Sequence, residues 1–255
     1  MPTPKVLVDV HDGLMVITLN RPEVKNAIDR DVSYGVCAAV DELDARDDLR
    51  VGILTGAGGT FCSGMDLVAF LRGESPRVKG RGILGIARTP PDKPLIAAVE
   101  GYALAGGFEA VLACDLVVAS SEAQFGLPEA RRGLAAAAGG LIRLPRLVPQ
   151  RVAMELALTG APVDAGRLHH FGLVNRIVAP GQALAESRLL AEQIIANAPL
   201  SVAASKRVIL AQRDWSAQDS FDRQDEITAE VLASEDAREG AAAFAEKRPA
   251  RWTGR

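Results

Sequence analysis

The sequence is poor in the features that mark several large protein classes. Aromatic residues make up only 4% of the 255 residues, so the core has to be built mainly from Ala, Val, Leu and Ile. The 29 basic and 32 acidic residues nearly balance, which is unlike the strong basic excess of nucleic-acid-binding proteins. The longest uncharged run of small residues, 133–142, is about half a membrane span. We therefore expect neither nucleic acid nor a membrane as a partner.

Cysteine is scarce as well. Cys37, Cys62 and Cys114 are widely spaced and form no pair motif or metal-binding pattern. We expect them to be buried, reduced thiols, and we expect no metal site. The first ten residues, MPTPKVLVDV, lack the apolar core of a signal peptide. Together these features predict a cytoplasmic protein.

The apolar patterns that are present predict an α/β fold. Asp12-Gly13 separates two strand-like stretches, 6–10 and 14–19, which is typical of a hairpin. Helical spacing follows over 32–43, and strand patterns recur at 50–56, 94–101 and 115–120, with a short helix over 106–114. Residues 72–93 look like a surface loop with room for one short helix.

The last quarter of the chain differs from the rest. Its pattern is helical from Leu184 to Phe244, with a break at Asn197-Ala198-Pro199. We therefore predict an α/β core over 1–199 and a helical C-terminal region over 200–255.

A glycine-rich turn at 101–109 (GYALAGGFE) leads into the predicted short helix. A helix beginning at Gly106 would present free N–H groups and the positive end of its dipole, which suits an oxyanion or a phosphate. A second turn, 61–67 (FCSGMDL), could supply another backbone N–H and complete an oxyanion hole. Close helix packing and a simple strand-to-helix connection are the structural alternatives.

Two glutamates stand at predicted helix starts. Glu109 lies among apolar neighbours, and Glu129 follows Pro128 after a strand. Both positions suit a carboxylate for structural reasons, because the helix dipole favours negative charge there. Buried carboxyls also have raised pKa values and can transfer protons near neutral pH. Two of them around one water could serve as base and acid in a hydration.

In their order and spacing, these segments resemble the enoyl-CoA hydratase/isomerase (crotonase) superfamily. The matching stretches are NRPEVKNAI (20–28), GILTGAGGTFCSGMDL (52–67), KPLIAAVEGYALAGGFEAVLACDLVVAS (93–120), AQFGLPEARRGL (123–134), GLVNRIV (172–178) and the tail 243–255. The resemblance implies a crotonase-like spiral of strand-strand-helix turns. It also implies a helical C-terminal trimerisation region and a homotrimer or a hexamer built as a dimer of trimers.

The resemblance also implies roles for individual residues. The oxyanion hole would use the backbone N–H groups of Met65 and Gly106, and Glu109 and Glu129 would be catalytic. Candidates for CoA binding are Lys25, Asp66 and Lys247, the last of which could act from a neighbouring subunit. For both lysines, a solvated surface position is the alternative.

Because both glutamates are present, the resemblance favours an enoyl-CoA hydratase, which adds water to a trans-2-enoyl-CoA. CoA would then be part of the substrate, and no cofactor is expected. An acyl-CoA isomerase or a specialised dehydratase of the same fold is the alternative, and a non-catalytic acyl-CoA-binding homologue is another. Departures from the family pattern at Ala105, Phe108, Arg131, Arg132 and 135–138 leave the acyl group open. His169 and His170 look like cations at a helix end rather than bases.

Overall fold

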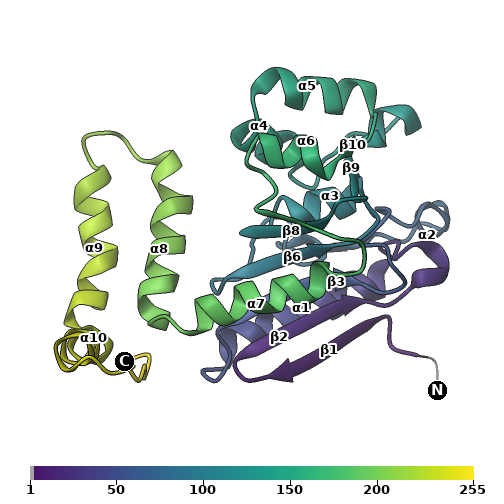
Figure 1. The fold of residues 1–255 in the computed structure, drawn as a ribbon. Helices are drawn as coiled ribbons and strands as arrows, with labels where there is room; N and C mark the ends of the chain where they lie inside the picture. The colour runs from purple at the N-terminus through teal and green to yellow at the C-terminus, as the bar shows by residue number, and fades with distance from the viewer. Residues whose placement is uncertain (1–2) are drawn as a thin grey trace.

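A six-stranded sheet lies at the centre of the computed structural model, which describes residues 3–255 (Figure 1). In spatial order its strands are β1 (Val6–His11), β2 (Leu14–Leu19), β3 (Val51–Gly56), β6 (Leu95–Val99), β8 (Leu116–Ser120) and β11 (Arg176–Val178). β1 and β2 form the predicted antiparallel hairpin across Asp12-Gly13, and all other neighbours in the sheet are parallel.

The inner strands are buried because helices cover both faces of the sheet. In β6, Leu95, Ala97 and Val99 join the core formed with α1 (Arg30–Ala45), whereas Ile96 and Ala98 pack toward α7 (Ala183–Ile195). Strands buried on both faces read as continuous apolar runs, which explains the strand signals at β3 and β6.

A small second sheet positions the site. It contains β7 (Tyr102–Leu104), β9 (Gln124–Gly126) and β10 (Val163–Asp164) in the order β10-β9-β7, and Cys62 forms a parallel bridge to Ala103 beside it. The segment at Cys62, β7 and β9 each follow a strand of the large sheet and lead into a helical turn. These turns are α2 (Leu67–Leu71), α3 (Gly106–Val111) and the 3-10 helix η2 (Pro128–Arg132). Because the segments run parallel, the three turns begin at the same edge.

Two details of the sequence prediction were wrong. Residues 72–93, all of which the structure describes, contain no helix but the two-residue strands β4 (Arg77–Val78) and β5 (Gly82–Ile83). The helix predicted over 106–114 ends at Val111. α4 (Gly140–Leu147) and α5 (Gln150–Thr159) were not predicted, whereas α6 (Ala165–His170) ends at the two histidines expected at a helix end, and all three lie around the small sheet (Figure 1).

The C-terminal helices stand apart from the sheet (Figure 1). α7 ends at Ile195 and α8 (Pro199–Ala211) starts at the predicted break, followed by the 3-10 helix η3 (Gln212–Asp214), α9 (Ser220–Ala233) and α10 (Glu235–Glu246). α8 and α9 have no fully buried residue. The division of the chain at residue 199 stays a prediction. Within residues 3–255 no single helix is long and apolar enough to cross a membrane. Only the helical stretches 183–195 and 199–214 taken together reach that length and apolarity, and the chain bends by 108° between them.

Candidate active site

The segments that the sequence singled out meet at one cavity of about 700 Å³. The residues that line it include Met65 from the turn 61–67, Gly106 and Glu109 from α3, and Glu129 from η2. The convergence follows from the small sheet, which brings the starts of these turns to the same edge.

Two backbone N–H groups lie side by side in this cavity. Ile28 pairs with the neighbours of Met65, because its N–H donates to Gly64 and its carbonyl accepts from Asp66. This pairing leaves the N–H of Met65 without an acceptor within residues 3–255. Gly106 is the first residue of α3, so its N–H has no partner in the helix. A Cβ added to Gly106 would lie 3.8 Å from the amide nitrogen of Met65, so the two donors are adjacent.

The backbone that holds these donors is strained. Ala105, immediately before α3, has φ 50° and ψ −126°, a conformation that favours glycine. Opposite it, Gly64 has φ 103°, and a Cβ added there would approach the Cβ of Ala105 to 2.7 Å. Gly64 therefore permits the close approach that places Met65 beside Gly106.

Glu109 is buried and held by backbone donors. Only 3% of the residue is exposed, and Oε1 accepts hydrogen bonds from the N–H groups of Ala138 (2.7 Å) and Gly140 (2.9 Å). Burial raises the pKa of this carboxyl, and the two hydrogen bonds partly offset the rise. A glycine suits this position, since a Cβ at Gly140 would make a tight contact of 3.1 Å with the Glu109 Oε1.

Glu129 is the group best placed to exchange a proton. It is 9% exposed, and its Oε2 is buried without a hydrogen-bond partner within residues 3–255. Burial raises the pKa of Glu129 to about 7, and the negative charge of Glu109 adds to the rise. A carboxyl with a free oxygen and such a pKa can donate or accept a proton at neutral pH.

Comparison with known proteins identifies the family of this chain. The family model described as Enoyl-CoA hydratase/isomerase matches residues 9–255. The chain belongs to this family. It is 41% identical over 251 residues to a protein named carnitinyl-CoA dehydratase from Salmonella arizonae, which covers 94% of this chain and 95% of that protein.

Solved structures agree with the family assignment. A crystal structure of an enoyl-CoA hydratase from Mycobacterium tuberculosis superimposes with a TM-score of 0.98 at 55% identity, covering 99% of this chain and 100% of that one. That of a carnitinyl-CoA hydratase from Mycobacterium avium gives 0.79 at 40% identity and full coverage of both chains. The predicted α/β class and crotonase-like fold are confirmed.

The CoA-binding candidates of this family member are dispersed. Lys25 lines the cavity, and its Nζ lies 5.0 Å from the centre of the Tyr102 ring. Asp66 does not line the cavity: it caps α2 by accepting from Val68 and Ala69, and it pairs with Arg21 at 3.0 Å. Its structural role leaves it no evident task in CoA binding. Lys247 directly follows α10 and does not line this cavity, so its CoA contact stays a prediction.

The structure adds cavity residues that the sequence reading did not assign to the site. Arg77, from the segment read as a surface loop, lines the cavity, as does Tyr102 of β7. The cavity is also lined by positions at which the sequence departs from the family pattern, namely Arg132, Ala135, Ala137 and Ala138. Arg131 instead turns away, since its Nε donates to the carbonyl of Thr159.

The two histidines lie at a helix end, as predicted. His169 and His170 are the last residues of α6, and the Nδ1 of His169 lies 2.7 Å from the carbonyl oxygen of Val174. Neither histidine lines the cavity that holds Glu109 and Glu129.

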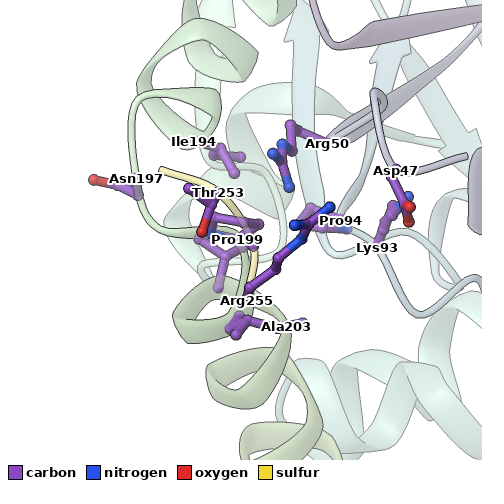
Figure 2. A pocket seen from close by; sticks show the side chains of 13 residues that line it. Asp47, Arg50, Lys93, Pro94, Ile194, Asn197, Pro199, Ala203, Thr253 and Arg255 are labelled. Atoms are coloured by element: carbon purple, nitrogen blue, oxygen red, sulfur yellow. The ribbon is translucent and has the colours of Figure 1, made fainter. Parts of the chain in front are cut away.

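A second cavity lies where the core meets the C-terminal helices (Figure 2). It has a volume of about 310 Å³ and lies between Arg50 and Lys93 of the core and Pro199, Ala203 and Arg255. Asp47 is the one acidic side chain among its lining residues. Because its lining contains no pair of carboxyl groups, this cavity does not suit the acid-base chemistry that the cavity with Glu109 and Glu129 supports.

Proposed function

We propose that this protein is an enoyl-CoA hydratase, which adds water across the double bond of a trans-2-enoyl-CoA. The observation that carries the proposal is Glu129, with its free carboxyl oxygen and a pKa of about 7, in the same cavity as Glu109. The two unused N–H groups of Met65 and Gly106 line that cavity as well. CoA is part of the substrate in this proposal, and the chemistry needs no further cofactor.

The N–H groups would act on the thioester. If its carbonyl oxygen lies between Met65 and Gly106, both donors point at the atom that becomes negative when the enolate forms. Such donors bind the enolate more strongly than the neutral thioester, and this difference is what accelerates the reaction. A donor of this kind typically contributes about 3–4 kcal/mol to transition-state stabilisation.

The two glutamate carboxyls would accept a proton from the attacking water and donate a proton to the substrate. Oε1 of Glu109 is occupied by two backbone donors, so Oε2 is left to accept a proton from water as its oxygen attacks the β-carbon. Glu129 in its protonated form would protonate the α-carbon. The proton gained by Glu109 then restores Glu129 by exchange within the coupled pair, so that one water supplies both groups added to the double bond.

The reverse reaction is a second candidate, favoured by the curated relatives named carnitinyl-CoA dehydratase. Loss of water from a 3-hydroxyacyl-CoA uses the same donors and carboxyls, because a catalyst accelerates both directions. An isomerase would move the double bond without taking up water, and a non-catalytic homologue would bind acyl-CoA without turnover.

The test follows the loss of the conjugated thioester absorbance with crotonyl-CoA and longer 2-enoyl-CoA substrates. Glu109→Gln and Glu129→Gln should each lower turnover by at least ~10²-fold, a typical contribution of acid-base catalysis. Glu122→Gln, at an exposed glutamate outside the cavity, is the matched control and should keep wild-type turnover. Unchanged turnover in Glu129→Gln would contradict the proposal, and a double-bond shift without water uptake would indicate the isomerase.

A further inference from the structure

The active-site cavity contains two guanidinium groups without a counter-charge. Arg77 and Arg132 both line it, and within residues 3–255 neither forms an ion pair or a side-chain hydrogen bond. Arg72, five residues before Arg77, does pair with an acid, Glu74, at 3.0 Å. The cavity therefore has two arginines available for a ligand.

The acidic residues of the cavity do not neutralise these arginines. Glu74 is engaged by Arg72, and Oε1 of Glu109 is taken by two backbone N–H groups. Glu129 makes no ion pair and is partly protonated at neutral pH. An anion that enters the cavity thus meets two free guanidinium groups, which bind carboxylates through paired N–H donors.

The two arginines come from segments that lie beside the two glutamates. Tyr102 lies in β7, just before Gly106, Ser63 lies two residues before Met65, and Lys25 lies over the Tyr102 ring. Arg132 instead belongs to the segment that leads from Glu129 to Ala138, the residue whose N–H holds Glu109. Arg77 lies near enough for its charge to act on Glu109. A thioester held at Met65 and Gly106, with its double bond beside the glutamates, would extend its remaining carbons toward these arginines.

The wall at this end leaves room for such a group. Ala135, Ala137 and Ala138, whose side chains are single methyl groups, line the cavity. We infer that the preferred substrate has an anionic acyl group, a carboxylate on the carbon chain beyond the double bond. The inference rests on the proposed function for the placement of the thioester. A trimethylammonium acyl group would face two like charges here and should bind poorly.

Binding of unreactive, saturated thioesters tests the inference apart from catalysis. Calorimetric titration would compare a five-carbon acyl-CoA that ends in a carboxylate with pentanoyl-CoA and with a 4-(trimethylammonio)butanoyl-CoA. We expect the carboxylate to bind at least tenfold more tightly than pentanoyl-CoA, and the cation to bind most weakly. Equal affinities for the carboxylate and the methyl chain would overturn the inference, whatever the turnover assay shows.

Variants assign the preference to the two arginines. The ratio of the two dissociation constants should fall about tenfold in Arg77→Gln and in Arg132→Gln. Arg131→Gln, which changes the arginine next to Arg132 that donates to the carbonyl of Thr159 and does not line the cavity, should keep the wild-type ratio. An unchanged ratio in both cavity variants would overturn the assignment.

The phosphates of CoA are the other anions that these arginines could meet. The same titrations with pantetheine thioesters, which lack the nucleotide and its phosphates, separate the two sources. If the arginines bind the acyl carboxylate, the preference and its loss in the variants persist with pantetheine. If both variants weaken every acyl-CoA equally and the effect vanishes with pantetheine, the arginines bind the CoA phosphates and the inference is wrong.

Discussion

At the scale of single residues, the arrangement that suits Glu129 to proton transfer also reduces stability. Its pKa of about 7 in the folded protein exceeds the ordinary glutamate pKa of 4.5, so the folded state binds the proton more tightly than the unfolded state. Stability is therefore unaffected by this group below pH 4.5 and declines as the pH rises to about 7. Above that pH the loss is on the order of 3 kcal/mol.

Glu129→Gln removes this loss. We expect the variant to match the wild type at pH 4.5 and to unfold at higher urea concentration at pH 8, by about 1–3 kcal/mol in free energy. Urea unfolding at both pH values and at one protein concentration measures the difference. Equal stability at pH 8 would mean that the Glu129 carboxyl is not desolvated as its burial indicates.

The same pKa predicts the pH dependence of hydration. If protonated Glu129 supplies the proton to the α-carbon, kcat/KM for hydration should fall above pH about 7, as the acid ionises in the free enzyme. Rates measured with crotonyl-CoA between pH 5.5 and 9 would show this decrease in kcat/KM. A profile that rises through pH 7 would instead assign Glu129 the role of base.

Ala105 offers a test of strain. Its φ of 50° suits glycine, so Ala105→Gly should relieve about 1–3 kcal/mol of strain and lose part of that gain to the greater freedom of glycine in the unfolded chain. We expect a net gain of about 1 kcal/mol, or about 2–4 °C in Tm. Ala103→Gly is the matched control: Ala103 lies in β7 without a positive φ, so this variant should be less stable than the wild type. A lower Tm for Ala105→Gly would contradict the strain argument.

Single residues also show what the sequence could and could not predict about the site. Met65, Gly106, Glu109 and Glu129 stand in turns whose spacing is visible along the chain, and the structure brings all four to one cavity. Arg77 carried no such signal, because its place depends on how the irregular segment 72–93 folds, and β4, which begins at Arg77, packs beside α1. Likewise, nothing in the sequence showed that Asp66 is paired with Arg21, 45 residues earlier.

At the scale of elements, long buried strands and amphipathic helices were predictable, and short ones were not. β3, β6, β8 and α1 carry enough apolar residues to define a period, and their predicted positions are confirmed. β7 and β9 have three residues each and pair with segments distant in sequence, so their extended form depends on the small sheet itself. Such pairings leave little local pattern to read.

One side chain connects the C-terminal helices to the core. Nζ of Lys206 in α8 donates to the carbonyls of Pro91 and Lys93 and pairs with Asp115 at 2.6 Å. Burial raises the pKa of Asp115 and the charge of Lys206 lowers it, so the lysine compensates a largely buried carboxylate.

Lys206→Met should therefore be costly, by about 3 kcal/mol, because it leaves Asp115 charged and unpaired. The double variant with Asp115→Asn should recover part of that loss, since no buried charge then remains. Urea unfolding of the two single variants and the double variant at one protein concentration gives the coupling. Additive losses would show that the pair contributes nothing beyond its separate contacts.

At the scale of the whole molecule, the C-terminal helices α8 and α9 contact each other but remain open to solvent on their other faces within residues 3–255. α8 and α9 have no fully buried residue, yet most helical stability in proteins comes from packing an apolar face. Large apolar side chains remain exposed on these helices, among them Phe221 (74%) and Leu232 (77%) of α9. Exposed apolar surface of this extent is typical of an interface.

We therefore expect the chain to assemble through α8 and α9 as a homotrimer, or as a hexamer of two trimers, with further copies covering the faces that one chain leaves open. Sedimentation velocity at micromolar concentration should give a single species of three or six chains. Phe221→Asp or Leu232→Asp should shift it toward smaller species, because each places a charge in an apolar contact. Leu158→Asp, at an equally exposed leucine of α5 (73%), should leave the assembly unchanged. A monomeric wild type would mean that contacts within one chain, among them those of α8 with α9 and of Lys206 with Asp115, hold these helices. It would also rule out a contribution of Lys247 from a neighbouring subunit.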